Sequence, residues 1–140
     1  MMAVREAVTN GDADAIAAFH IPQNYDAKVC EFEYAKNGMI GLETLFGVIG
    51  KCIPVKGNHA SWTLDKLITL LTVNSRTIFN MPVPEIKEGA AASITLFDPA
   101  AEYVFDAAMI ASKSSNTPFV GKTLKGKVIG IINGDKIHIN

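Results

Sequence analysis

Apolar and polar residues recur with one period in the first part of the chain and with another in the second. Val4 to Val8 reads as the end of a helix, which Asn10-Gly11 would stop. Ala13 to Phe19 is a short run of small apolar residues, which predicts a strand buried on both faces in a parallel sheet. Such a strand needs parallel neighbours that a helix–strand–helix start does not supply. We therefore expect the chain to be a fragment of a larger fold.

Two further helices are predicted after this strand. Leu42 to Ile49 carries apolar residues at helical spacing. A second apolar stripe starts at Leu64, with Thr63 as the predicted N-cap and Asp65 in the first turn. Met81-Pro82-Val83-Pro84 ends this helix, because the residue before a proline is disfavoured in helical conformation.

From Gly89 the period changes to two, as in half-buried β-strands. Residues 92–96 alternate between the two faces of a predicted strand. Asp98-Pro99 predicts a turn, and Glu102 to Asp106 predicts another short strand.

The end of the chain holds the clearest local signal. Ser112 to Gly126 is rich in Ser, Gly, Lys and Pro and is predicted to be a loop. Lys127 to Ile132 and Lys136 to Ile139 then flank Asn133-Gly134. An Asn-Gly pair suits the positive φ angles of a type I′ turn, so these segments predict a β-hairpin.

Composition narrows the class of protein. The 140 residues are 49% hydrophobic and 19% charged, with a net charge of −1, so nothing indicates a nucleic-acid partner. No apolar run reaches the roughly 18 residues of a membrane span, and the start has no apolar signal-peptide core. Cys30 and Cys52 lack metal-type spacing and form no disulfide framework, which favours a cytoplasmic location. Cys30 has no histidine base partner in the sequence and is predicted to be inert.

Three stretches, in order, resemble the dihydroorotase family of cyclic amidohydrolases. Residues 14–23, Asp-Ala-Ile-Ala-Ala-Phe-His-Ile-Pro-Gln, resemble a family strand that ends in Asp-His-Ala-Pro-His. Residues 28–44 contain Glu-Phe and Gly-Met-Ile-Gly-Leu-Glu-Thr, and residues 112–128 contain Ser-x-x-Asn-Thr-Pro-Phe-x-Gly, ahead of the Asn133-Gly134 hairpin. The second and third stretches are specific, and the first is degraded.

The resemblance implies an α/β fragment. It would comprise the last strand and helices of a TIM-type (β/α)8 amidohydrolase barrel, in residues 1–84, followed by the C-terminal strands of a small β-sandwich, in residues 85–140. A whole barrel needs about 250 residues and cannot be present.

The resemblance also implies which site residues remain. Phe19 occupies the slot of the family's catalytic Asp, so no catalytic residue is intact, and the family's metal ligands have no counterpart. We therefore expect no cofactor in this chain, although the parent family uses zinc. Gln23 replaces a substrate-contacting His, and Asn37-Gly38 falls where the family's backbone holds the dihydroorotate ring.

The function implied for the parent is the reversible hydrolysis of dihydroorotate to carbamoyl aspartate in pyrimidine biosynthesis. We expect this chain alone to be inactive. Phe19 favours a second interpretation, a noncatalytic scaffold such as one for aspartate transcarbamoylase. A third, weaker interpretation is another cyclic amidohydrolase, a dihydropyrimidinase or an allantoinase. The unpaired strand 13–19 and the uncovered helix faces predict a homo-oligomer, most simply a two-fold dimer.

Several residues have a functional and a plain interpretation. His20 is either a metal ligand or a polar loop residue, and the lack of a second ligand nearby favours the loop. Gly38 and Gly41 either line a pocket or form turns. Four lysines either bind an anion or belong to a solvated loop, which is favoured: Lys113, Lys122, Lys125 and Lys127. His59 and His138 receive no role.

Overall fold

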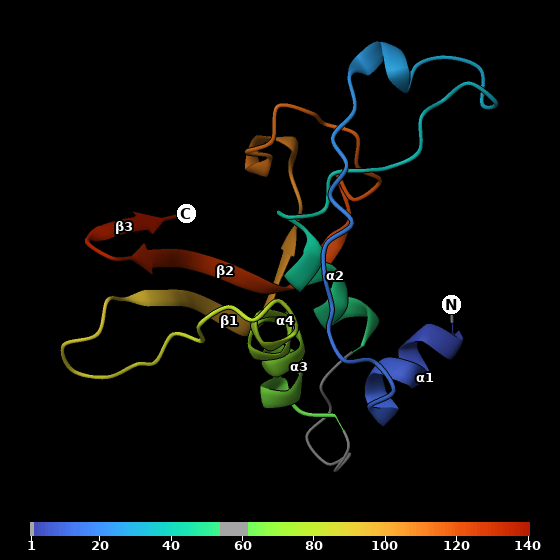
Figure 1. Cartoon of the computed structure of the whole chain (residues 1–140). Coiled ribbons are helices and arrows are strands. Elements are labelled where there is room, and N and C mark those ends of the chain that lie inside the picture. Colours follow the sequence, from blue (N-terminus) through green and yellow to red (C-terminus); the bar gives the residue numbers. More distant parts are fainter. Residues whose placement is uncertain (1, 54–61) are drawn as a thin grey trace. The chain divides into compact units, whose positions relative to one another are not determined.

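The structure is a computed structural model, and it describes residues 2–53 and 62–140. His59 lies outside the described residues. The helices are α1 (Met2–Asn10), α2 (Leu45–Cys52), α3 (Leu64–Leu71) and α4 (Val73–Ile78), with 3-10 turns at Tyr25–Ala27 and Ala107–Met109. Three strands, β1 (Ser93–Val104), β2 (Thr123–Asn133) and β3 (Lys136–Ile139), form a sheet in the order β1-β2-β3 (Figure 1). Among the described residues, no helix is long and apolar enough to cross a membrane.

The predicted helix boundaries at Asn10 and Thr63 are confirmed. Gly11 has a φ of +96°, and the N–H groups of Gly11 and Asp12 both donate to the carbonyl of Ala7. This is the left-handed C-terminal cap for which glycine is favoured. At the start of α3, the side chain of Thr63 accepts a hydrogen bond from the N–H of Lys66 at 3.2 Å.

The other helices differ in part from the prediction. α2 starts at Leu45, three residues after Leu42, because the N–H groups of Gly41 and Leu42 donate to the ring of His20 and hold these residues in a turn. The stripe after Thr63 is interrupted at Thr72, whose φ of −126° separates α3 from α4. α4 ends at Ile78, ahead of the prolines, as predicted.

The predicted buried strand from Ala13 to Phe19 is wrong for this chain. These residues form no regular strand, and Phe19 is 67% exposed. The N–H of Ile16 donates to the carbonyl of Leu70 at 3.1 Å, and only His20 pairs as a strand residue, in one parallel bridge with Met39. Within the described residues no second strand lies beside this segment, so it has no ladder to join.

The predicted turn at Asp98-Pro99 is also wrong. β1 continues through both residues and joins the two short strands that were predicted on either side. Proline lacks an N–H, but β1 is an edge strand of the sheet, where a proline is tolerated. β2 likewise starts at Thr123, inside the predicted loop.

The C-terminal hairpin is confirmed, although its turn type is not. β2 and β3 are antiparallel, with Gly130 opposite Ile139 and Asn133 opposite Lys136. The two central turn residues are therefore Gly134 and Asp135, and only Gly134 has a positive φ, of +62°. One positive φ at the first central position is the pattern of a type II′ turn, whereas type I′ requires two.

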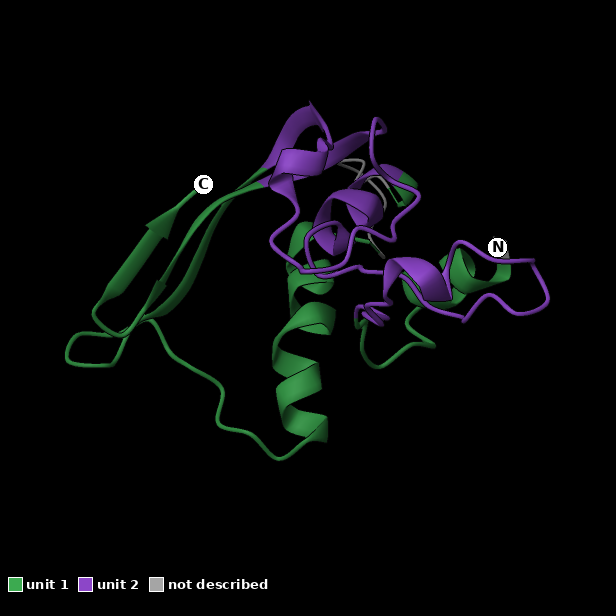
Figure 2. Ribbon diagram, turned by 90° about the horizontal axis from the view of Figure 1, so that it is seen from above, with its two compact units in different colours: residues 1–17, 52–98, 128–140 green, residues 18–51, 99–127 purple. Residues whose placement is uncertain are grey.

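The chain divides into two compact units (Figure 2). The first comprises residues 1–17, 52–98 and 128–140, and its buried apolar residues are Val8, Trp62, Leu67 and Leu70. The second comprises residues 18–51 and 99–127, and its buried apolar residues are Ile40, Ile49, Phe105 and Leu124. These units do not follow the boundary at residue 84, and the division into barrel and sandwich segments stays a prediction.

Two glycines let α2 lie close to strand residues in the second unit. A Cβ at Gly47 would come within 2.7 Å of the hydroxyl of Tyr103, and one at Gly50 would overlap the backbone carbonyl of Lys125. Burial raises the pKa of Tyr103 above its usual 10.0. This packing anchors the helix that directly follows residues 38–44, which belong to the candidate site.

Candidate functional site

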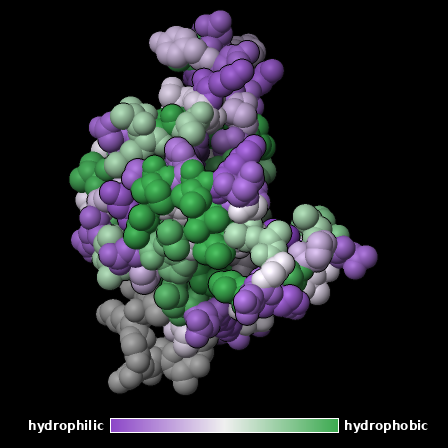
Figure 3. Space-filling model, turned by 90° about the vertical axis from the view of Figure 1, so that its left-hand side faces the viewer, coloured by the Kyte–Doolittle hydropathy of each residue, from purple (hydrophilic) through white to green (hydrophobic). Residues whose placement is uncertain are grey.

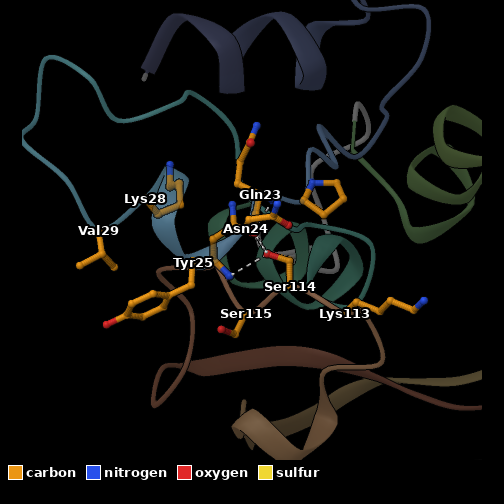
Figure 4. A pocket seen from close by; sticks show the side chains of 10 residues that line it. Gln23, Asn24, Tyr25, Lys28, Val29, Lys113, Ser114 and Ser115 are labelled. Carbon is orange, nitrogen blue, oxygen red and sulfur yellow. Dashed lines mark hydrogen bonds between the residues drawn. The ribbon is translucent and has the colours of Figure 1, made fainter.

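The second unit contains a cavity of about 590 Å³ between two loops (Figure 4). Its lining comes from residues between Pro22 and Val29 and from Lys113 to Asn116. Among these lining residues are two lysines, amides and hydroxyls, and no carboxylate. Lys28 and Lys113 extend in different directions in Figure 4, so they do not form one cationic centre.

Asn116 joins all three motif stretches at this cavity. Its side-chain oxygen accepts from the N–H of Gln23 at 3.3 Å, and its side-chain amide donates to the carbonyl of Gly38 at 3.1 Å. Its own carbonyl accepts from the N–H of Ile40 at 3.1 Å. The hydroxyl of Ser114 donates to the carbonyl of Gln23 at 2.7 Å and bonds the side-chain oxygen of Asn116. One amide side chain therefore positions both loops.

The residues that the sequence marks for substrate contact lie together. The side-chain amide of Gln23 donates to the carbonyl of Asn37 at 3.1 Å, and Gly38 follows with a φ of +113°. A Cβ at Gly38 would lie only 2.6 Å from the Cβ of Ile21. Glycine is thus required here both for the turn and for close approach. Gln23 makes a loop hydrogen bond, and its role as a substrate contact stays a prediction.

Glu43 and Thr44 end the second motif stretch, and Glu43 is hydrogen-bonded to the third stretch. One carboxylate oxygen of Glu43 accepts from the N–H of Ser112 at 2.9 Å. The other is buried and has no partner among the described residues. Thr44 is buried as well, and its hydroxyl donates to the carbonyl of Gly41 at 3.4 Å. Glu43 therefore links the second motif stretch to the start of the third, directly before the cavity-lining residue Lys113.

The described residues do not fit a zinc ion. They contain no group of three or more His, Cys, Asp or Glu side chains placed to hold a metal. The Nδ1 atom of His20 accepts from the N–H groups of Gly41 and Leu42, at 3.2 and 3.4 Å. Phe19 offers no donor atom, and Cys30 is exposed. No catalytic step through a metal can be derived from these residues.

Sequence reasoning assigned no role to Lys28, Ser114 or Asn116. All three fall inside the motif stretches that carried the family resemblance. No local pattern marks their roles, because their contacts join residues 10, 78 and 91 positions apart along the chain. Of the four lysines considered for an anion site, only Lys113 lines the cavity.

Comparison with solved structures shows which fold the chain shares. The chain superposes on a D-hydantoinase with a TM-score of 0.76 at 19% identity, covering 99% of this chain and 31% of that one. A D-hydantoinase from Bacillus sp. AR9 gives a TM-score of 0.71 at 17% identity, with 97% and 30% covered. The chain thus has the fold of about a third of these D-hydantoinase chains.

Comparison with curated proteins gives the family, although no family model matches. The chain is 38% identical over 135 residues to a dihydroorotase of Anaeromyxobacter dehalogenans, covering 96% of this chain and 30% of the relative. It is 40% identical over 129 residues to a dihydroorotase of Syntrophus aciditrophicus, with 92% and 29% covered. The chain belongs to the dihydroorotase family. It spans about 30% of the length of these relatives, and its motifs are those of the family's C-terminal part.

Proposed function

We propose that the chain supplies part of the substrate-binding site of a protein that hydrolyses dihydroorotate reversibly to carbamoyl aspartate. The carrying observation is that Gln23 and the Asn37-Gly38 backbone, which the family resemblance marks for substrate contact, meet through the 3.1 Å bond from the Gln23 side chain to the Asn37 carbonyl. In this proposal residues 1–84 belong to the barrel and residues 85–140 to the β-sandwich, in a cytoplasmic enzyme of pyrimidine biosynthesis.

The proposed contribution is binding and not catalysis. Cyclic amide hydrolysis needs a metal-activated water and a group that moves its proton to the leaving nitrogen. Phe19 can do neither, and the described residues of this chain do not fit zinc. An amide such as Gln23 can donate a hydrogen bond to a substrate carboxylate, without the strength of a charged donor. The zinc of the parent family would be held by residues beyond those described.

The test uses the 140-residue chain in two assays. After dialysis, we expect no stoichiometric zinc and no turnover of dihydroorotate, for the wild type and for Phe19→Asp alike, because one carboxylate does not complete a site of three or four ligands. In an NMR titration with dihydroorotate, the Asn37 and Gly38 amide signals should move while those of the Asn133-Gly134 turn stay. Turnover would contradict the proposal that this chain contributes binding and not catalysis. Unmoved Asn37 and Gly38 signals would contradict the proposal that these residues contact the substrate. Equal shifts with hydantoin or dihydrouracil would instead favour a related cyclic amidohydrolase.

A second function, a noncatalytic scaffold, is favoured by one residue. Phe19 stands in the family's catalytic slot and is 67% exposed. An exposed aromatic ring suits a contact with another protein. For this function we propose aspartate transcarbamoylase as the partner. Co-sedimentation with the enzyme of the same organism would support it if Phe19→Asp weakened the association. A matched change at another exposed ring, Phe32→Asp, should leave the association intact.

A further inference from the structure

Three side chains donate hydrogen bonds to three successive backbone carbonyls in the second unit. The ammonium of Lys28 donates to the carbonyls of Lys36 and Gly38, at 2.8 and 3.1 Å. Gln23 donates to the carbonyl between them, that of Asn37, and Asn116 adds a second donor to that of Gly38. Every carbonyl from residue 36 to residue 38 is therefore held by a side chain.

Lys28 is the only charged donor of this group. Its ammonium lies among carbonyl oxygens, and hydrogen bonds from charged donors are stronger than those between neutral groups. The loop that it closes is long, because Lys28 and Gly38 are ten residues apart. The closure is completed by the N–H of Lys36, which donates to the carbonyl of Ala27 at 3.0 Å. Without the ammonium, residues 28–36 would be held at their base by this one backbone bond and short local turns.

We propose that Lys28 is a positioning residue that fixes the backbone of residues 36–38 in a ligand-ready conformation. The carbonyls of this segment already accept from internal donors, and the N–H of Lys36 donates to the carbonyl of Ala27, so the N–H groups of Asn37 and Gly38 are the donors that we propose meet a ligand. The site therefore selects ligands that carry hydrogen-bond acceptors, such as carboxylates and ring carbonyls. The ligand half of this proposal rests on the proposed function, whereas the clamping half does not.

We call the two hydrogen bonds from the Lys28 ammonium to the carbonyls of Lys36 and Gly38 the clamp. It is tested by amide hydrogen exchange in Lys28→Met, which keeps nearly the length of the side chain and removes its donors. We expect exchange at the Lys36 amide to rise by about tenfold, with hairpin amides such as Gly130 unchanged. Lys113→Met is the matched control. Lys113 lines the same cavity, and its side chain donates no hydrogen bond within the described residues. Lys28→Arg, whose guanidinium can also donate to carbonyls, should restore part of the protection. Unchanged exchange in Lys28→Met, or an equal rise in Lys113→Met, would overturn the clamp.

Two further measurements keep the outcomes separate. If Lys28→Met fails to fold, the test is the exchange rate of the lysine ammonium protons with water in the wild type, measured by NMR. The ammonium protons of Lys28 should exchange more slowly than those of Lys113. Equal rates would refute the clamp. In a titration with dihydroorotate, Lys28→Met should weaken the shifts at Asn37 and Gly38 several-fold. If the wild type shows no shifts while the exchange result holds, the proposed function fails at this site and the clamp stands.

Discussion

The β2–β3 hairpin and the segment from Ala13 to Phe19 are both predicted as strands from the sequence, yet only the hairpin forms a ladder of backbone hydrogen bonds. Two turn residues separate the hairpin strands, and four residue pairs are in register from Gly130–Ile139 to Asn133–Lys136. The segment 13–19 is held at separate points, through the N–H of Ile16 and through the carbonyl of Asp14, which accepts from the side chain of Asn74 at 2.8 Å.

The difference lies in where the partner strand is encoded. A hairpin carries its partner next to it, at little cost in loop entropy. A parallel strand needs neighbours brought from a distance along the chain. Relatives of this chain are about three times as long, and the missing neighbours of residues 13–19 would come from that additional length. In the part of the chain that the structure describes, the backbone of this segment is hydrogen-bonded only at Asp14 and Ile16.

The largest expected effect is therefore on assembly. We predict a two-fold dimer with residues 13–19 at or near the contact, because unpaired backbone N–H and C=O groups are a template for pairing with another chain. Apolar side chains are also exposed at the surface (Figure 3), and the hairpin exposes Ile129 and Ile131 on one face and Ile137 and Ile139 on the other. Light scattering at micromolar concentration should give about twice the chain mass of 15.0 kDa. Replacing Ala17 by Lys should return the mass of the monomer, whereas a monomeric wild type would rule the dimer out.

The second effect compares the space around one glycine from each region. In the hairpin, a Cβ at Gly130 would lie 2.5 Å from the carbonyl oxygen of His138, so Gly130→Ala must push the strands apart. Beside the other segment, a Cβ at Gly41 would meet Ala18 and Phe19 at an ordinary 3.8 Å. We expect Gly130→Ala to lower the free energy of unfolding by about 2–3 kcal/mol and Gly41→Ala to change it by less than about 0.5 kcal/mol. Urea unfolding should be followed by circular dichroism, and equal losses would contradict this account of the ladder.

The same distinction decides how much of the fold was predictable. The caps at Asn10 and Thr63 and the hairpin depend on residues within a few positions of each other, and all three were predicted. The failed strand at 13–19 depends on neighbours that the described chain does not contain. The turn at Asp98-Pro99 failed because a proline is compatible with the edge position of β1, and edge positions are not visible in a sequence.

The candidate site shows a similar division. Gln23, Asn37 and Gly38 were found through their place in family motifs, and the structure brings them together, but their role toward a substrate stays a prediction. Lys28 and Asn116 were missed because both bond to Gly38 from a distance along the chain. Lys28 is 10 positions from Gly38, and Asn116 is 78 positions from it. Such contacts arise only when three loops fold onto one another, and no local pattern encodes them.

The smallest expected effect concerns the tether of residues 13–19. Asn74→Ala removes the bond to the carbonyl of Asp14, which is exposed, so we expect a loss of no more than about 1 kcal/mol in the free energy of unfolding. The local consequence should be clearer than the global one, since Ile16 is then held only by its bond to Leu70. Exchange at the Ile16 amide should rise several-fold in Asn74→Ala, while amides of the β2–β3 ladder stay at their wild-type rates. Asn24→Ala is the matched control, because the Asn24 side chain makes no capping hydrogen bond to the 3-10 turn that follows it. If Ile16 exchanged at the same rate in all three proteins, the segment would have to be held by packing and not by this tether.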